Sequence, residues 1–351
     1  MTAKIGSPGL VAALASAALF GATTPIAKQL LGGASPLLIA GLLYLGSGIG
    51  VTLLRVVQDR GGSSAGLVRS DWPWLAAATV AGGILAPVLL MVGLARSDAA
   101  TASLLLNLEA VFTAVIAWFV FREATSARVV LGFIAIFLGG LLLAWPAQAS
   151  PGRSLGLLSV AAACLCWGLD NNLTRRISAA DSRVIAGIKG LVAGTTNTVL
   201  AVALGAKFPT LPYLAGTLVL GFVGYGVSLV LFIVALRHLG TARTGAYFST
   251  APFIGTAIAV VLYGQPITGA FWLAAALMGV GVWLHVTEHH EHVHVHEPMT
   301  HSHSHEHDEH HQHEHSAEWD GTEPHTHEHD HALLRHHHFH FPDTHHQHRH
   351  G

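Results

Sequence analysis

The chain has 351 residues, of which 51% are hydrophobic and only 11% are Asp, Glu, Lys or Arg. A soluble globular chain carries about 25% charged residues, so the composition excludes an ordinary soluble domain and indicates a membrane protein. The net charge of −2 averages an apolar body and a polar tail, because all of the 27 His except His238 lie at or beyond His285. The two Cys residues, Cys164 and Cys166, lie in one apolar run, which excludes a disulfide framework.

Apolar segments of the length that a helix needs to cross a bilayer follow one another through the body. Because every backbone polar group must be satisfied inside the hydrocarbon, we expect these segments to be helices. The first segment has no small-x-small cleavage site followed by a polar chain, so it is predicted to be a membrane helix and not a signal peptide. The ten predicted spans are 9–31, 36–56, 73–94, 100–121, 127–145, 154–173, 183–205, 211–236, 243–263 and 268–286.

Basic residues are distributed unevenly over the connections between these spans. If the N-terminus is cytoplasmic, the cytoplasmic connections hold most of the Lys and Arg residues, whereas the outer side holds Arg96, Arg153 and Lys207, with Lys28 near that edge. Cytoplasmic loops of membrane proteins are enriched in Lys and Arg. The sequence therefore predicts that both termini are cytoplasmic.

The body repeats itself at a separation of about 141 to 147 residues. "LFGATTPIAKQLL" from Leu19 resembles "CWGLDNNLTRRIS" from Cys166, and the stretch from Ala95 resembles the stretch from Leu236 in its polar turn, small residues and Phe. Five helices per copy place the second copy in the opposite sense, which is the inverted repeat typical of secondary transporters. We expect an all-α integral membrane protein with repeats at 1–147 and 148–288 and a tail at 289–351.

From about residue 8 to 287 the chain resembles the EamA-type members of the drug/metabolite transporter superfamily. The most specific stretch is "NLEAVFTAVIAWFVFRE", which ends in the aromatic-x-Glu turn typical of that group; the second repeat departs from it, with Gln265 in the place of Glu123. The resemblance implies a ten-helix, two-repeat fold in the inner membrane and the export or exchange of a small solute. The group spans amino acids, nucleotide sugars, drugs and other metabolites, so the solute stays open.

Ionisable residues within membrane helices mark function, because a charge at the bilayer centre costs at least about 2.5–3.5 kcal/mol. Glu109 lies near the middle of the fourth span, where burial favours the protonated carboxyl, so it could bind and release a proton. A structural hydrogen bond between helices is the alternative. Lys189, inside the seventh span, could pair with Glu109 or could extend its stem to the cytoplasmic edge.

Other polar groups within the spans are candidates for the transport pathway. Each also has a structural interpretation: an interfacial turn for the polar cluster of the sixth span, and helix–helix hydrogen bonds or packing for the others. These further candidates are Asn107, Asp170, Asn171, Asn197 and Tyr247.

The sequence contains no hydrolase triad, P-loop or dinucleotide fingerprint, which indicates a protein that is not an enzyme and needs no cofactor. Without an ATP site, transport is expected to use an ion or solute gradient. The expected partners are the lipid bilayer and a small-molecule solute, with no nucleic acid, and a homodimer stays open.

The tail carries 25 of the 27 His, since only His238 and His285 precede it, with acidic residues between them. Imidazole nitrogen binds Zn, Ni, Co and Cu, and His-rich tracts are typical of metal binding. So few aliphatic residues predict a tail that is disordered without metal. The candidate metal-binding residues are His292, His294, His296, His301, His303, His305, His307, His310, His311, His313 and His315.

Three functions remain open, two of them transport functions; the third is a membrane-anchored metal buffer that transports nothing. The body could export an organic metabolite or drug-like solute while the tail buffers or senses metal. Alternatively, it could export divalent transition metals that the tail collects. The body has few groups within its predicted spans that could bind a metal, which favours the organic solute.

Overall fold

The computed structural model describes residues 8–58, 67–120, 127–144, 151–177, 180–264, 267–287, 291–296, 299–305, 325–331 and 334–339. The chain divides into two compact units, the first holding the described residues up to 287 and the second the strands from residue 291 onward. Each unit is described by itself. The first unit is helical throughout its described residues, as the composition predicts.

The first half of the helical unit runs from α1 to α7. Its elements are α1 (Pro8–Leu30), α2 (Pro36–Gln58), η1 (Arg69–Asp71), α3 (Trp72–Ala78), η2 (Thr79–Leu85), α4 (Ala86–Arg96), α5 (Ala99–Leu105), α6 (Leu108–Phe119) and α7 (Ala127–Ala144). The second half consists of α8 (Pro151–Arg175), α9 (Ser182–Ala203), α10 (Leu211–Gly221), η3 (Phe222–Val227), α11 (Ser228–Phe248), α12 (Ala251–Tyr263) and α13 (Gly269–Val286).

Eight of the described helices are long and apolar enough to cross a membrane, and two shorter apolar helices, α12 and α13, follow them. These helices coincide with the predicted spans. One boundary was wrong: the predicted span 211–236 continues as α11 to Phe248, so the connection expected at 237–242, which includes His238, lies within a helix. The segment from Ser228 to Phe248 contains no proline, and Leu, Ala and Arg in its second half are good helix formers, so nothing ends the helix before Ser249.

The irregular points of the first half recur in the second. η2 and η3 are both π-helical turns, and η3 begins at Phe222, 143 residues after η2 begins at Thr79. The two-residue break at 106–107, between α5 and α6, has a counterpart at 249–250, between α11 and α12. The halves therefore share both the order of their helices and the places where the helices are interrupted.

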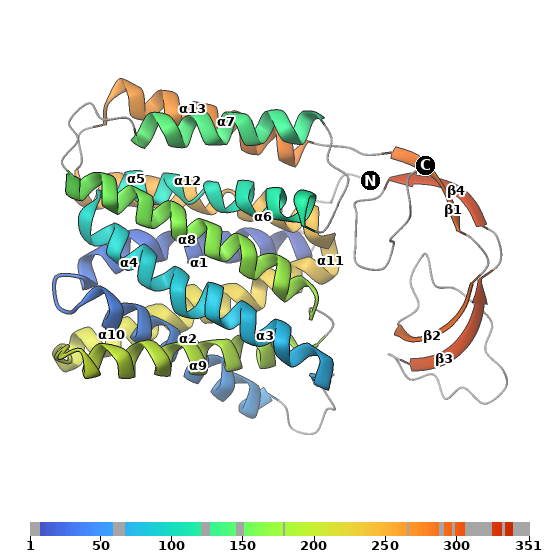
Figure 1. The fold of residues 1–351 in the computed structure, drawn as a ribbon, viewed down its shortest axis with the longest axis horizontal. Helices are drawn as coiled ribbons and strands as arrows, with labels where there is room; N and C mark the ends of the chain where they lie inside the picture. The colour runs from blue at the N-terminus through green and yellow to red at the C-terminus, as the bar shows by residue number, and fades with distance from the viewer. Residues whose placement is uncertain are drawn as a thin grey trace. The chain divides into compact units, whose positions relative to one another are not determined.

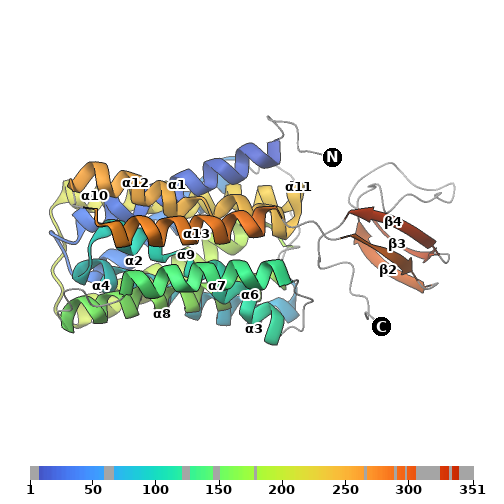
Figure 2. The ribbon, with the colours of Figure 1, turned by 90° about the horizontal axis from the view of Figure 1, so that it is seen from above.

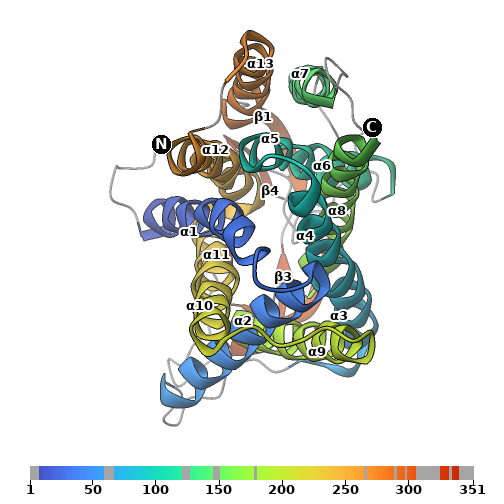
Figure 3. The same ribbon diagram turned by 90° about the vertical axis from the view of Figure 1, so that its left-hand side faces the viewer.

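The helices of the first unit lie side by side along one direction (Figures 1 and 2). Viewed along that direction, α7 and α13 lie next to each other at one side of the bundle (Figure 3). The packing between the halves is reciprocal: α1 contacts α11 and α12, while α8 contacts α4 and α6. The two second helices, α2 and α9, pack directly against each other.

Glycines allow the close approach of α2 and α9. A Cβ atom on Gly190 would lie 2.5 Å from the backbone nitrogen of Gly48, and a Cβ on Gly48 or Gly194 would collide with the facing backbone. Small residues at such crossings are typical of membrane helices, because association there depends on close packing. This contact holds together the elements that carry Tyr44 and Lys189.

The second unit contains two antiparallel strand pairs, β1 (Glu291–His296) with β4 (Leu334–Phe339) and β2 (Met299–His305) with β3 (His325–His331). In the second pair the His positions are in register, with His301 opposite His329 and His303 opposite His327. The sequence predicted no regular structure here. Val alternates with His in β1, and β2 and β3 contain Thr300 and Thr326; β-branched residues favour extended backbone.

Gly190→Ala tests the α2–α9 contact. The added methyl group must displace the backbone of α2, which we expect to lower the free energy of unfolding by about 1–3 kcal/mol. The matched control is Gly216→Ala, since no atom lies within 4 Å of the Cβ position there, and Ala is the better helix former. Thermal melting of the purified proteins in detergent measures both; equal melting temperatures for the two variants would contradict the close contact.

Candidate functional site: a polar network around α8

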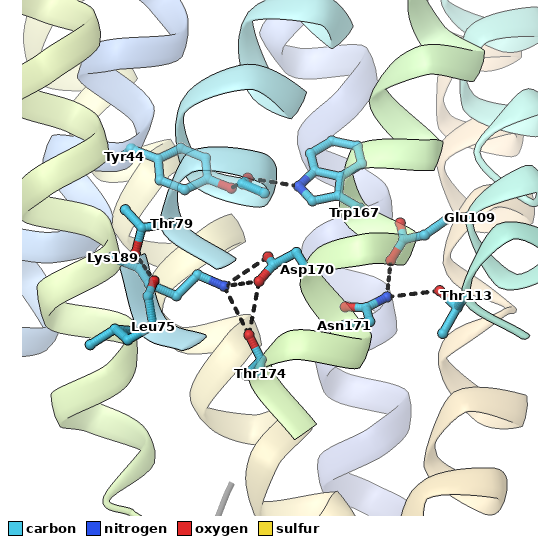
Figure 4. A network of polar contacts seen from close by, with 11 residues as sticks. Tyr44, Leu75, Thr79, Glu109, Thr113, Trp167, Asp170, Asn171, Thr174 and Lys189 are labelled. Carbon is cyan, nitrogen blue, oxygen red and sulfur yellow. Dashed lines mark hydrogen bonds and ion pairs between the residues drawn. The ribbon is translucent and has the colours of Figure 1, made fainter. Parts of the chain in front are cut away.

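A buried ion pair joins α8 and α9. Lys189 Nζ donates to Asp170 Oδ1 at 2.5 Å and to Asp170 Oδ2 at 2.7 Å. Thr174, one turn after Asp170, donates its hydroxyl to Asp170 Oδ1 at 2.8 Å, and Lys189 Nζ lies 3.3 Å from the same hydroxyl oxygen. Asp170 and Lys189 are 7% and 6% exposed, so both charges are compensated within the protein (Figure 4).

The π turn η2 packs against both α8 and α9, the helices that carry these two charges. Gly82 in η2 leaves the space that the Asp170 carboxylate fills: a Cβ atom on Gly82 would collide with that carboxylate. The long stem of Lys189 extends from α9 past η2 to reach α8. A residue without a side chain at position 82 is therefore a condition for the ion pair.

The same π turn frees a backbone carbonyl. The Ala86 N–H donates to Ala81 O and not to Gly82 O as in an α-helix, and Pro87 has no N–H to donate. The Gly82 carbonyl oxygen instead accepts hydrogen bonds from Tyr44 Oη at 2.7 Å and from Trp167 Nε1 at 3.0 Å. Two aromatic side chains, from α2 and α8, are thereby fixed beside the ion pair.

Glu109 lies on the other side of α8. In the first turn of α6, it accepts a hydrogen bond from Asn171 Nδ2 at 2.9 Å. Asn171 Nδ2 also lies 3.2 Å from Thr113 Oγ1, and Asn172 donates to the Thr113 carbonyl at 2.9 Å and to the Gly168 carbonyl at 2.8 Å. The consecutive residues from Asp170 to Asn172 therefore connect α8 to α9 on one side and to α6 on the other (Figure 4).

Neither of the two expectations for Lys189 was right. It does not pair with Glu109, and it does not extend to the cytoplasmic edge; its partner is Asp170. The reason is geometric: α8 and α9 both pack against η2, where Lys189 reaches Asp170, whereas Glu109 faces Asn171. The structure brings Asp170, Asn171 and Lys189 together with Glu109 in one chain of contacts.

Three other predicted residues lie apart from this chain of contacts. Asn107 is the N-cap residue of α6 and donates to Leu104 O at 2.9 Å, and its Nδ2 lies 3.9 Å from Met278 Sδ. Asn197 is fully buried on α9 and donates to Ile84 O of η2 at 3.1 Å. Tyr247 is half-buried on α11 against a cluster of alanines from α1 and α11.

Sequence reasoning did not identify Gly82, Thr113 or Thr174. The α8 segment did carry a signal, because Trp167, Asp170, Asn171 and Thr174 follow the spacing of one helix face. Gly82 carried no such signal. It is one of many glycines in apolar helices, and the sequence does not show where a π turn leaves a carbonyl without its helical hydrogen bond.

Cys164 and Cys166 lie on α8 as buried and half-buried residues, and the Cys164 thiol is 3.8 Å from Leu105 O. Among the described residues, no three His, Cys, Asp or Glu side chains are grouped closely enough to hold a metal ion. Of the candidate metal-binding residues in the tail, His307, His310, His311, His313 and His315 lie outside the described residues. The other six lie on β1 and β2.

Neutralising the ion pair one member at a time tests its energetics. Lys189→Met or Asp170→Asn leaves one buried charge without its partner, which we expect to destabilise the protein by about 3 kcal/mol or more. The double variant buries no lone charge and should be more stable than either single variant. Thermal melting in detergent measures the cycle, and a double variant that loses the sum of the two single effects would contradict direct coupling.

Comparison with known proteins agrees with this architecture. Over 295 residues the chain is 26% identical to an uncharacterised transporter of Methanothermobacter thermautotrophicus, covering 79% of this chain and 85% of the relative. A permease-like protein of Bacillus subtilis is 32% identical over 69 residues, 20% of this chain and 88% of that protein. A protein crystal structure shares the fold, with a TM-score of 0.59 and 21% identity, covering 78% of this chain and 94% of that one.

Both halves of the chain match one family description, residues 7–145 and again residues 154–287. The two matched ranges cover the described helices almost completely and leave out the His-rich tail. The chain is a multi-pass membrane protein that belongs to the EamA-like transporter family.

Proposed function

We propose that this protein is a gradient-driven secondary transporter of the cell inner membrane that exports a small organic solute. In this proposal its helices form ten spans, arranged as two inverted five-helix repeats, with both termini in the cytoplasm. The recurrence of the π turns and helix breaks after about 143 residues supports the repeat. Since each half matches the same family, the two halves have the relation that inverted-repeat transporters require.

The observation that carries the proposal is the polar network of Glu109, Asn171, Asp170 and Lys189, in which Asp170 and Lys189 are buried and Glu109 and Asn171 are half-buried. Glu109 of the first half contacts Asn171 of the second, and the Asp170–Lys189 pair of the second half lies against η2 of the first. Ion pairs of this kind are expensive to bury and contribute little net stability compared with apolar packing. In secondary transporters, solute and coupling ions bind between the repeats, near the middle of the membrane.

Glu109 is the proposed coupling residue. The Asn171 amide donates a hydrogen bond to its carboxyl, and an amide donor can stabilise an ionised carboxylate. The same amide nitrogen also contacts Thr113 Oγ1. Asp170 is occupied by Lys189, whereas the contact that the structure describes for the Glu109 carboxyl is a neutral one. A proton can therefore enter and leave Glu109 without breaking an ion pair.

Glu109→Gln removes the exchangeable proton and keeps a side chain of similar shape. In proteoliposomes we expect an outward-directed solute flux driven by a pH gradient to fall at least about tenfold, since general acid–base groups contribute effects of this size or larger. Glu109→Asp, which keeps a carboxyl group, is the control and should retain measurable coupling. Full pH-driven flux in the Gln variant would disprove proton coupling through Glu109.

The tail is proposed to bind Zn, Ni, Co or Cu in the cytoplasm. Its chemistry supports this role, since imidazoles alternate with small and acidic residues from His289 onward. The alternative function, efflux of these metals with the tail as collector or sensor, rests on the same tail. It predicts that the cargo is the metal itself.

Removing residues 289–351 distinguishes the two. We expect the full chain to bind several equivalents of Zn²⁺ or Ni²⁺ in calorimetric titration and the truncated chain to lose this binding. Solute flux through the truncated chain should be unchanged. Loss of cellular tolerance to nickel, cobalt, zinc or copper on full deletion of the protein, with metal flux in proteoliposomes, would favour the metal-efflux alternative instead.

A further inference from the structure

Two contacts hold the end of α1 that lies on the outer side of the membrane in the proposed topology. The first is made by Lys28 in the last turn of α1, whose Nζ donates to the carbonyl oxygen of Leu94 and, at 2.8 Å, to that of Ser97. Both carbonyls lie at the C-terminal end of α4, where the last carbonyl groups of a helix have no partner within it and attract positive charge. Lys28 therefore joins the end of α1 to the end of α4.

This lysine is not needed merely to cap α4. The last turn of α4 has a cation of its own, Arg96, whose Nη1 donates to Val92 O at 3.3 Å, and the Ser97 hydroxyl donates to Gly93 O at 2.7 Å. Along their length α1 and α4 touch at few points, since α1 packs mainly against α11 and α12. The Lys28 contact therefore connects two helices that are otherwise free to separate at this end.

The second contact comes from the other half of the chain. Tyr263, the last residue of α12, donates its hydroxyl to the carbonyl oxygen of Pro25 on α1 at 2.8 Å. α12 lies beside α1 (Figure 3). Pro25 and Lys28 are three residues apart, so one turn of α1 is tied to α4 of the first half and to α12 of the second.

Pro25 also interrupts the hydrogen bonding within α1. It lies inside the helix and has no N–H to donate to the Gly21 carbonyl. That carbonyl faces Gly255 of α12, where a Cβ atom would lie 2.6 Å from the Gly21 oxygen. The last turn of α1 is therefore joined to the rest of the helix by one hydrogen bond fewer, at the kind of residue where helices bend.

The corresponding residues of the second repeat differ. Pro25 corresponds to Asn172, and Tyr263 corresponds to Phe121, which has no hydroxyl group. α4 ends where its counterpart α11 continues as a helix through residues 237–240. A helix that continues uses its carbonyl groups internally, so it presents no helix end at this place. The combination of a lysine on a helix end, a tyrosine and a proline is therefore built at one end of the bundle only.

We propose that Lys28 and Tyr263 form a gate at the outer end of the transporter, closed in this structure, and that the last turn of α1 moves about Pro25 when the gate opens. Opening separates Lys28 from the α4 carbonyls and the Tyr263 hydroxyl from the Pro25 carbonyl. The interior behind the gate then communicates with the outside, and solute leaves by this route. This inference rests on the proposed function and assigns the residues that control release.

The strength of the two contacts suits a gate. A charge at a helix end shifts an equilibrium by about twofold to thirtyfold, and a hydroxyl hydrogen bond shifts one by about twofold to tenfold. Contacts of this size bias a two-state equilibrium without fixing it in one state. Removing either contact should therefore increase the open population by these factors.

Ser103 on α5 provides a reporter behind the gate. It is fully buried, and a Cβ atom on Gly255 would lie 3.2 Å from its hydroxyl oxygen and 2.6 Å from the Gly21 carbonyl, one turn further into the bundle than Pro25. In the full-length chain with both native cysteines replaced by alanine, Ser103→Cys supplies a single thiol. A membrane-impermeant maleimide is applied from outside to right-side-out vesicles. Since a buried thiol reacts only when the protein opens, the alkylation rate measures the open population.

Each contact has a variant and a matched control. Lys28→Met keeps the apolar stem and should raise the alkylation rate by about twofold to thirtyfold, and Tyr263→Phe removes only the hydroxyl and should raise it by about twofold to tenfold. Lys207→Met and Tyr213→Phe make the same changes at exposed residues and should leave the rate unchanged. Equal rates in the Lys28→Met and Lys207→Met proteins would overturn the gate.

The hinge is tested by Pro25→Ala. Alanine keeps the carbonyl that Tyr263 contacts and restores an N–H for the Gly21 carbonyl, so the last turn of α1 should bend less readily. We expect alkylation of the reporter from outside to become slower than in the protein with proline. A rate that stays the same or rises would show that α1 does not move about this residue.

The same maleimide applied to inside-out vesicles separates gate opening from general loosening. The gate variants should change the rate from the outside alone. A Lys28→Met protein that reacts faster by the same factor from both sides is loosened throughout, and that result would overturn the gate. Hydrogen exchange of the full-length chain with its native Ser103 is the second measurement: the last two turns of α1 should exchange faster in Lys28→Met, while α2 and α9 exchange as before.

Failure of the gate and failure of the proposed function give different results. Proteoliposomes are tested for export of a panel of labelled amino acids, nucleotide sugars and drugs. If members of the panel are exported while neither gate variant changes the alkylation rate, the gate is wrong and the transporter stands. If none is exported while alkylation still follows Lys28 and Tyr263, the proposed function fails and the role of the gate in release fails with it.

Discussion

The ion pair between Asp170 and Lys189 is the contact on which the interior of this protein depends. A carboxylate and an ammonium group can both stay charged in an apolar interior only when they touch, because neither has water to solvate it. That requirement sets the separation of α8 and α9, which both pack against the π turn η2 and are joined by this pair. It also requires glycine at position 82, where any side chain would displace the carboxylate.

The same π turn serves two further side chains. By shifting one backbone hydrogen bond and being followed by Pro87, η2 leaves the Gly82 carbonyl to accept from Tyr44 and Trp167. A local departure from α-helical geometry thus positions two aromatic rings from different halves of the chain. π turns within helices are frequent at functional sites, and here the reason is the carbonyl group that the turn frees.

The two repeats share a backbone plan but differ in chemistry. Tyr225 in η3 follows Gly82 in η2 by the same 143 residues that separate the starts of the two turns. The second repeat therefore has an aromatic side chain at the position where the first has glycine. By the same offset, Pro252 at the start of α12 corresponds to Glu109 at the start of α6. The two halves share their backbone plan. The polar network, in contrast, is made of residues that have no like residue at the corresponding position of the other half. The two copies are therefore not interchangeable in function.

The sequence by itself determined that the body is a helical membrane protein and where most of its apolar helices lie, because long apolar runs and short polar connections leave a membrane chain few alternatives. It also identified Glu109, Asp170, Asn171 and Lys189, since charged and amide side chains are conspicuous within apolar helices. Only the tertiary structure decided which of them are partners. Lys189 was expected to pair with Glu109 or to reach the membrane edge, and it pairs with Asp170 because α8 and α9 both pack against η2, where the two side chains meet. The sequence likewise did not predict the role of Gly82. The hydrogen bonds to its carbonyl and the space that its missing side chain leaves both depend on the neighbouring helices.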